Sequence, residues 1–293
     1  MTTAPPHDRA PGSRNLPLTI PPPNSGRRGM SPRPSAVPSR PSWRKEVALI
    51  AAFYVVYTAI RDLRGTRPVS ASLAFANARK VISLERTLGV FREAQIQHWV
   101  LHDRLVVEAL DVWYATTHFV VTAAVLIGLF FRHPSAYRPW RNILAFSTAV
   151  ALVGFAVFPL MPPRLLPSAY GFTDTLKTVG GLWDFDSGPM PHISDQFAAM
   201  PSLHFAWALW SGLALFAVAR RRWAKIAALA YPAVTLVCVI VTANHYFTDT
   251  VAGAGIVAAG YAASAAWSSR RSLRLLTPGP QAPGADLLDP LDP

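Results

Sequence analysis

Long apolar runs separated by short polar connections dominate this chain. About 20 helical residues cross the hydrocarbon core of a bilayer, which is about 30 Å thick, and six runs reach roughly that length. They lie at 44–63, 108–131, 141–160, 202–219, 223–243 and 248–268. The first run is the weakest, because its uncharged core extends only from Val47 to Ile60. The pattern predicts an all-α, polytopic membrane helix bundle with six transmembrane helices.

The segment between the first two runs has a different pattern. Residues 70–103 carry apolar side chains at helical spacing, and Gly89 interrupts them. This spacing predicts two amphipathic helices that lie on the external membrane interface. In the sixth run, small residues recur at helical spacing, which indicates close helix packing. They are Ala252, Gly253, Gly255, Ala259 and Gly260.

These patterns divide the chain into four regions. Residues 1–42 contain 11 prolines and little apolar periodicity, so we expect a disordered, basic cytoplasmic tail. Residues 43–104 would form the first transmembrane helix and the external amphipathic segment. Residues 105–270 would form a transmembrane core that carries the candidate catalytic residues. Residues 271–293, rich in Pro, Gly and Asp, would form a C-terminal tail.

Composition and charge agree with a membrane protein. The chain is 51% hydrophobic and 15% charged, and its net charge is +12. Such a charge is also typical of a nucleic-acid binder, but the placement of the basic residues indicates that they set the orientation of the chain in the membrane. Six spans put 18 Lys and Arg on the side of both termini and 10 on the other. The positive-inside rule then places both termini in the cytoplasm, although eight basic residues in 61–104 weaken the inference. We expect a multi-pass protein of the cell membrane and no nucleic-acid partner.

Two histidines fall on the external side of this topology. His204 begins the fourth run and His245 ends the fifth, and Asp249 follows His245 by four residues. In a helix, that spacing places the carboxylate one turn from the imidazole. A carboxylate bonded to one ring nitrogen leaves the other nitrogen basic, as a nucleophile requires. The alternative is a polar pair that merely caps the sixth run.

The residues before His204 are suited to binding an anion. Pro201 fits the first position of a helix, whose free N–H groups and positive dipole end attract a phosphate. Ser202 adds a hydroxyl donor. A transferred phosphoryl group also requires a cation. Arg164 ends a Pro-Pro-Arg stretch on the external side, whereas Arg138 lies on the cytoplasmic side, so we select Arg164.

Three short motifs carry a family resemblance. They are Pro162-Pro-Arg164, Pro201-Ser-Leu-His204 and His245-Tyr-Phe-Thr-Asp249. In this order they resemble the motifs of the type-2 phosphatidic acid phosphatase superfamily. The residues of the second and third motifs are most similar to those of its inositol phosphorylceramide synthase-like branch. The resemblance covers roughly residues 108–268.

The resemblance implies an integral membrane lipid-phosphate phosphatase or phosphotransferase. It would act at the external membrane face through a phosphohistidine, without a metal or other cofactor. His245 would be the nucleophile, Asp249 would orient it, and His204 would protonate the leaving group. Arg164, Pro201, Ser202 and Leu203 would surround the phosphate. The partners implied are a lipid phosphate substrate and membrane lipids, and the acceptor is left open between water and an alcohol such as inositol.

The chain departs from the family pattern at three points. Leu203 replaces the usual glycine of the second motif. Val239 stands six residues before His245, where many members have a phosphate-binding arginine. The first motif also lacks its full lysine-to-arginine spacing. Phosphate binding would therefore rely on Arg164 and on a basic residue from 61–104, with Arg64 and Arg67 as candidates.

Several alternatives stay open. A metal-dependent membrane enzyme is one, because two histidines and an aspartate can ligate a metal. A non-catalytic scaffold or transporter is another, favoured by Val239. His118 in the second run could equally be a packing residue or a support for the site. His98 and His192 are further candidates for a pocket, and Cys238 reads as an apolar packing residue.

Overall fold

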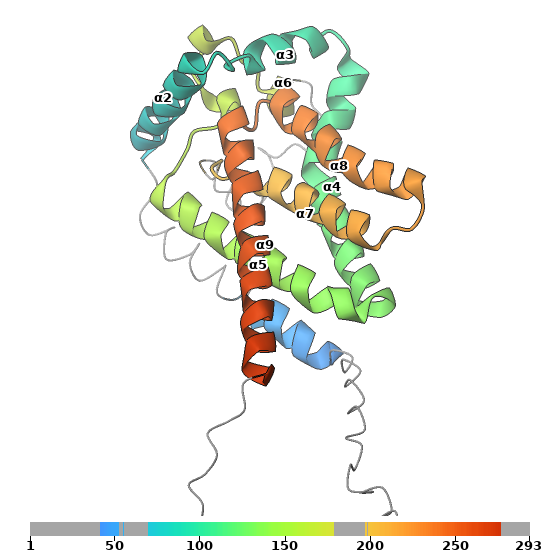
Figure 1. Cartoon of the computed structure of the whole chain (residues 1–293). Helices are drawn as coiled ribbons and strands as arrows, with labels where there is room; N and C mark the ends of the chain where they lie inside the picture. The colour runs from blue at the N-terminus through green and yellow to red at the C-terminus, as the bar shows by residue number, and fades with distance from the viewer. Residues whose placement is uncertain (1–41, 53–54, 56–69, 179–196, 198, 277–293) are drawn as a thin grey trace, which may run out of the picture. The chain divides into compact units, whose positions relative to one another are not determined.

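Helices form most of the described part of the chain, which comprises residues 42–52, 55, 70–178, 197 and 199–276 of a computed structural model (Figure 1). These residues belong to one compact unit that begins at Arg40. The α-helices are α2 (Ala71–Thr87), α3 (Glu93–Val100), α4 (Arg104–Arg132), α5 (Pro134–Val157), α6 (Thr175–Thr178), α7 (Leu203–Val218), α8 (Arg222–Val241) and α9 (Phe247–Leu276). Two short 3-10 turns, η1 (Pro163–Leu165) and η2 (Ser168–Tyr170), follow α5.

Four of these helices are long and apolar enough to cross a membrane, which confirms a helical membrane bundle. They are α4, α5, α8 and the Phe247–Trp267 part of α9. They coincide with four of the six predicted runs. A fifth run, 202–219, forms α7, which has only 16 residues and a length of about 24 Å. In the remaining run, 44–63, helix is described for 43–52 and at 55, and the rest lies outside the described residues.

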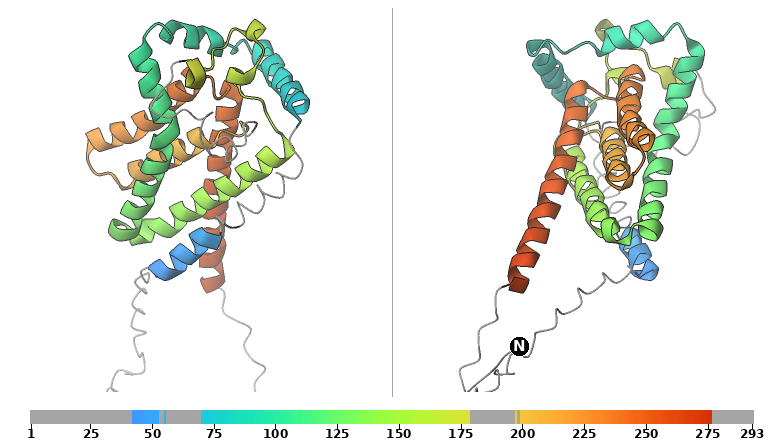
Figure 2. Two further views of the ribbon diagram at one scale, coloured as in Figure 1. Left: turned by 180° about the vertical axis from the view of Figure 1, so that it is seen from behind. Right: turned by 45° about the vertical axis from the view of Figure 1, so that its right-hand side comes forward.

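The apolar helices pack into a core between α4, α5, α7 and α9. Trp210 of α7 is completely buried there, and its indole N–H donates to the backbone carbonyl of Trp140 at 2.8 Å. Helices α7 and α8 lie side by side (Figure 2). Gly212 permits this, because a Cβ there would stand 2.5 Å from the backbone oxygen of Ala228.

A second core lies where α2 meets the segments that follow α5 and α8. Ala74, Ala78, Val81 and Ile82 of α2 pack there with Met161, Tyr246 and neighbouring apolar residues. The two helices predicted on either side of Gly89 are therefore present, and Gly89 has the φ of +72° that a helix-ending glycine commonly adopts. Their place on the external membrane interface stays a prediction.

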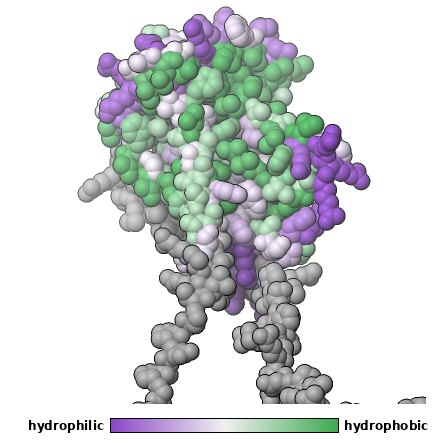
Figure 3. Space-filling view, in the orientation of Figure 1, coloured by the Kyte–Doolittle hydropathy of each residue, from purple (hydrophilic) through white to green (hydrophobic). Residues whose placement is uncertain are grey.

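Many outward-facing side chains of the bundle are apolar (Figure 3). Phe119, Val120 and Ile127 of α4, Val153 of α5 and Val251 of α9 are each more than half exposed. In water such a surface would favour association, whereas in a bilayer it contacts lipid.

Close packing between α9 and α7 depends on Gly253. A Cβ at this position would lie 2.6 Å from the backbone oxygen of Ser202, whereas a Cβ at Gly255 would have no neighbour within 4 Å. The small-residue pattern of the sixth run thus has its closest backbone contact at Gly253, a tight contact with side chains of α5 at Gly260, and an open position at Gly255.

We expect Gly253→Ala and Gly255→Ala to have opposite effects on thermal unfolding in detergent. Alanine favours a helix over glycine by about 1 kcal/mol, so Gly255→Ala should leave the unfolding temperature unchanged or raise it. Gly253→Ala should lower it, because overpacking against an immobile backbone typically costs about 1–3 kcal/mol. Equal shifts for the two variants would contradict the close contact.

Candidate active site

His245 lies in the chain reversal between α8 and α9, rather than at the end of a helix as predicted. Helix α8 ends at Val241, and Ala243 takes a φ of +50° in the turn that follows. The backbone carbonyl of Val239 accepts the N–H groups of both Asn244 and His245, at 3.1 and 3.2 Å. The turn therefore directs the imidazole by main-chain contacts.

Asp249 occupies the first turn of α9 and contacts His245. Its Oδ2 lies 3.1 Å from Nδ1 of His245, and the two side chains are almost completely buried. The four-residue spacing was expected to act within one helix, but it spans the turn and the first turn of the next helix. A carboxylate can only accept a hydrogen bond, so Nδ1 carries the proton and Nε2 of His245 is left basic.

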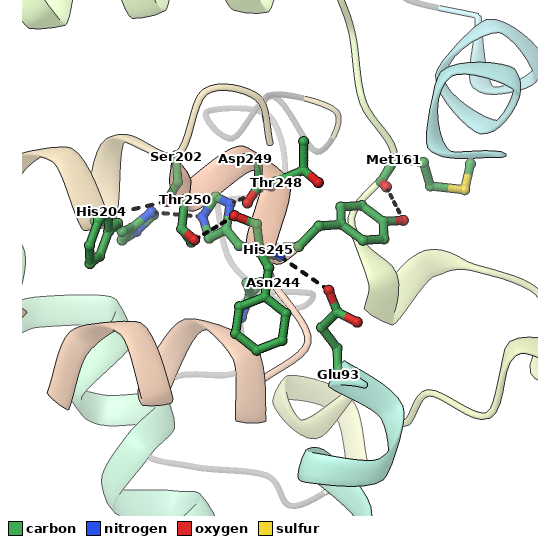
Figure 4. A network of polar contacts seen from close by, with 12 residues as sticks. Glu93, Met161, Ser202, His204, Asn244, His245, Thr248, Asp249 and Thr250 are labelled. Carbon is green, nitrogen blue, oxygen red and sulfur yellow. Dashed lines mark hydrogen bonds and ion pairs between the residues drawn. The ribbon is translucent and has the colours of Figure 1, made fainter. Parts of the chain in front are cut away.

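His204 meets this basic nitrogen from the first turn of α7 (Figure 4). Its Nδ1 lies 3.3 Å from Nε2 of His245. Since Nε2 carries no proton in this tautomer, Nδ1–H of His204 is the donor. Asp249, His245 and His204 form a continuous polar chain.

The start of α7 differs from the prediction by two residues. Pro201 was expected at the first helical position, but Ser202 is the N-cap and Leu203 is the first helical residue. The Ser202 hydroxyl oxygen accepts the N–H of Phe205 at 3.3 Å, and its backbone N–H donates to the carbonyl of Asp249 at 3.0 Å. Ser202 thus links the second motif to the third, and its hydroxyl hydrogen can still donate to a ligand.

Arg164 is held beside His245 by the turn itself. Its backbone N–H donates to the carbonyl of Ala243 at 2.8 Å, and its Nε donates to Oδ1 of Asn244 at 3.0 Å. One terminal nitrogen, Nη1, pairs with Asp174 at 3.1 Å. The rejected candidate, Arg138, lies in the first turns of α5, whereas Arg164 follows the C-terminal end of that helix.

Two aromatic side chains of α4 cover the face of His204. Tyr114 stacks on it with ring centroids 4.2 Å apart, and the His118 ring lies 4.1 Å away at a steeper angle. The structure therefore places His118 against the candidate site. The sequence analysis did not propose Tyr114 as a site residue, although its spacing of four from His118 puts both on one helical face.

The remaining candidate residues differ in their position and burial. His98 is exposed on α3, beside Trp99 and Gly171. Val239 and Cys238 are completely buried in α8, and Leu203 is half-buried. Arg64, Arg67 and His192 fall outside the described residues.

Sequence reasoning missed Asn244 and Asp174, which hold Arg164. Only the position of Asn244 beside His245 could have indicated its role.

The arrangement defines a polytopic membrane protein with two histidines, an aspartate and an arginine gathered at its helix ends. A family model of the PAP2 superfamily matches residues 79–263, which is well over half of the chain. The chain belongs to the PAP2 superfamily, whose members are phosphatases or phosphotransferases that act on phosphate-containing lipids in membranes. The match begins within α2, upstream of the region in which the motifs were recognised. No curated protein and no solved structure matches the chain.

We expect Arg164→Lys to weaken vanadate binding by about 10–100-fold, because a lysine keeps the charge but loses the guanidinium fork and the contact with Asn244. Vanadate is a suitable probe because it mimics the transferred phosphoryl group. Isothermal titration calorimetry in detergent measures the affinity.

Arg141→Lys is the matched control. Arg141 also pairs with a carboxylate, Glu46, through Nη1 at 2.6 Å, but it lies on α5 near the end remote from Arg164. It should lower stability and leave vanadate binding intact. Unchanged affinity in Arg164→Lys would show that another cation meets the oxyanion.

Proposed function

We propose that this protein is an integral membrane lipid-phosphate phosphatase or phosphotransferase that works through a phosphohistidine on His245. The observation that supports this most directly is the polar chain from Asp249 through His245 to His204, with contacts of 3.1 and 3.3 Å. It supplies a basic nitrogen, a group that orients it and a proton donor within reach of one another.

In the first step, Nε2 of His245 attacks phosphorus and a P–N bond forms. The P–O ester bond opposite to it breaks, and its electron pair leaves with the oxygen of the lipid alcohol. His204, protonated on both nitrogens when the anionic phosphate is bound, transfers one proton to that oxygen. Asp249 stabilises the positive charge that develops on His245 through the Nδ1–H bond.

In the second step, water or an alcohol attacks the phosphohistidine. His204, now neutral, takes the proton from the attacking oxygen as the P–N bond breaks. His245 returns to its starting tautomer, and the product is inorganic phosphate when water is the acceptor or the phosphate monoester of the acceptor when it is an alcohol.

The two histidines lie too close together for substrate to fit between them. At 3.3 Å, Nε2 of His245 and Nδ1 of His204 leave no room for a phosphorus atom and a leaving oxygen. Under this proposal, the two imidazoles move apart when substrate binds. Binding replaces the contact between the histidines with one contact from each imidazole to the substrate.

The charge on the phosphoryl oxygens would be met by Arg164, the Ser202 hydroxyl and the first N–H groups of α7. Pro201 stands beside this donor set. Leu203, in place of the usual glycine, still provides its backbone N–H, because the side chain does not alter that donor. Val239 is buried in α8 and offers no charge, so the role of the missing arginine would fall to Arg164 and to a basic residue from 61–104.

The residues of the second and third motifs support assignment to the inositol phosphorylceramide synthase-like branch, and with it an alcohol as the acceptor. A panel of lipid phosphates, assayed with and without inositol, distinguishes transfer from hydrolysis. Formation of an inositol phosphate ester would assign transfer, and release of inorganic phosphate alone would assign hydrolysis.

We further propose that the site faces the outside of the cell membrane and that both termini are cytoplasmic, from the 18 to 10 division of basic residues. A reporter fused after Arg274 should be cytoplasmic, and one inserted after His102, between α3 and α4, should be external. The opposite labelling would place His204 and His245 on the cytoplasmic side.

Substitution of the two histidines should separate their roles. His245→Ala should reduce turnover to background on every substrate, because no covalent intermediate can form. His204→Ala should slow turnover of a lipid phosphate by about 10²–10⁴-fold, the usual contribution of a general acid. It should be partly rescued on p-nitrophenyl phosphate, whose leaving oxygen is stable without a proton. Asp249→Asn should lie between the two.

His98→Ala, an exposed histidine outside the site, should behave as the unaltered protein. Equal losses for His204→Ala and His245→Ala on both substrates would refute the assignment of roles. Loss of turnover in a chelator, restored by one metal, would favour a metal-dependent enzyme. Full activity in folded His245→Ala would refute the phosphohistidine.

A further inference from the structure

Two completely buried glutamates contact the start of the helix that carries Asp249. Glu85 Oε1 on α2 accepts the backbone N–H of Thr248 at 2.7 Å, and Glu93 Oε1 on α3 accepts that of Phe247 at 3.1 Å. Figure 4 shows Glu93 directed at this turn. The residue before α9 is Tyr246, which is not a capping residue type. The cap of α9 is thus supplied by side chains more than 150 residues earlier in the chain.

Burying two carboxyl groups together is costly unless their charge is compensated. The N-terminal end of α9 compensates one charge through its N–H groups and its dipole. Burial and the neighbouring Glu85 carboxyl raise the pKa of Glu93 to about 8, so this side chain holds a proton at neutral pH. Among the described residues, Oε2 of each glutamate has no hydrogen-bond partner.

The capped residues lie between the two members of the proposed catalytic pair. His245 precedes Phe247 by two residues, and Asp249 directly follows Thr248. Two further contacts secure the same stretch: the Tyr246 hydroxyl donates to the carbonyl of Met161 at 3.0 Å, and the carbonyl of Asp249 accepts from Ser202. A displacement of Phe247 and Thr248 would change the alignment of His245 with Asp249.

We propose that Glu85 and Glu93 are positioning residues for His245, which hold the start of α9 so that the nucleophile stays aligned after substrate separates it from His204. This inference rests on the proposed function. In the resting site, His204 helps to hold the His245 ring. Once phosphate lies between them, His245 is held by Asp249 and by its own backbone. The two glutamates hold the backbone of Phe247 and Thr248, and thereby the positions of His245 and Asp249.

The cap also gives α2 and α3 a role in the site. The matched family region starts at residue 79 and therefore includes both glutamates. The two helices would then form part of the catalytic unit, in addition to any contact that they make with the membrane surface.

The test compares leucine and glutamine at both positions. Glu85→Leu and Glu93→Leu remove the acceptor, and we expect kcat to fall by about 10²-fold, as for a small misplacement of reacting groups, with little change in KM. Glu85→Gln and Glu93→Gln keep an acceptor oxygen and should retain most of the activity. Rapid-quench measurement of the phosphohistidine should show slower formation in the leucine variants.

Asn77→Leu is the matched control. Asn77 is a buried polar residue of α2 that donates to the carbonyl of Pro159 at 2.9 Å, and neither of its hydrogen bonds among the described residues reaches α9. It should lower the unfolding temperature as Glu85→Leu does, with kcat close to that of the unaltered protein. Hydrogen exchange of the Thr248 amide should accelerate in Glu85→Leu but not in Asn77→Leu.

The pH profile provides a second readout if the leucine variants do not fold. Glu93 is faced by Glu85 of α2 and by Tyr246 of the α8–α9 turn, and Asp249 lies near Tyr246. Since the folded state favours the protonated form of Glu93, its contribution to stability is complete below the ordinary pKa and is lost as pH rises to about 8. The kcat should decline over the upper part of this range, and Glu93→Gln, which cannot ionise, should remove the decline.

The outcomes distinguish the two proposals. If the unaltered protein shows no His245-dependent turnover, the proposed function fails and this inference fails with it. If turnover depends on His245 while folded Glu85→Leu and Glu93→Leu are as active as Asn77→Leu, only the positioning role is refuted. An alkaline decline unchanged in Glu93→Gln would also refute it.

Discussion

Backbone hydrogen bonds to the α8–α9 turn and to the first turn of α9 bring the three motifs together. Arg164 N–H donates to the carbonyl of Ala243, and Ser202 N–H donates to that of Asp249. Because these are main-chain contacts, they depend little on the identity of the side chains involved. The arrangement can therefore be kept although Leu203 and Val239 depart from the family pattern. The side chains that carry the chemistry are added to a framework of peptide groups.

The membrane explains why this framework lies at helix ends. Apolar side chains of α4, α5 and α9 face outward, where lipid would contact them, and no water is available there for unpaired peptide groups. At a helix end the last N–H and C=O groups lack partners within the helix. In this protein Glu85, Glu93 and Ser202 satisfy such groups, and the same ends hold the candidate catalytic residues.

The sequence predicted the parts of the structure that depend on local spacing. Apolar runs located α4, α5, α7, α8 and α9, and the four-residue spacing of His245 and Asp249 identified a pair that is in contact. Few residues in the sequence indicated the contacts between distant segments. Glu85 is an exception, because it lies on the apolar face that Val81 and Ile82 define, where a carboxylate is unexpected. The short length of α7 and the place of Pro201 depended on the cap at Ser202, which spacing alone does not determine.

The pairing of Arg164 with Asp174 has a consequence for how strongly phosphate is held. In the structure the guanidinium already has an anionic partner at 3.1 Å. Under the proposed function, an incoming phosphate would compete with this carboxylate, and its affinity would reflect the difference between the two partners. A cation shared in this way holds an oxyanion less tightly than an unpaired cation would. Weak retention would suit the proposed activity, since phosphate that stayed bound after each cycle would block the next substrate.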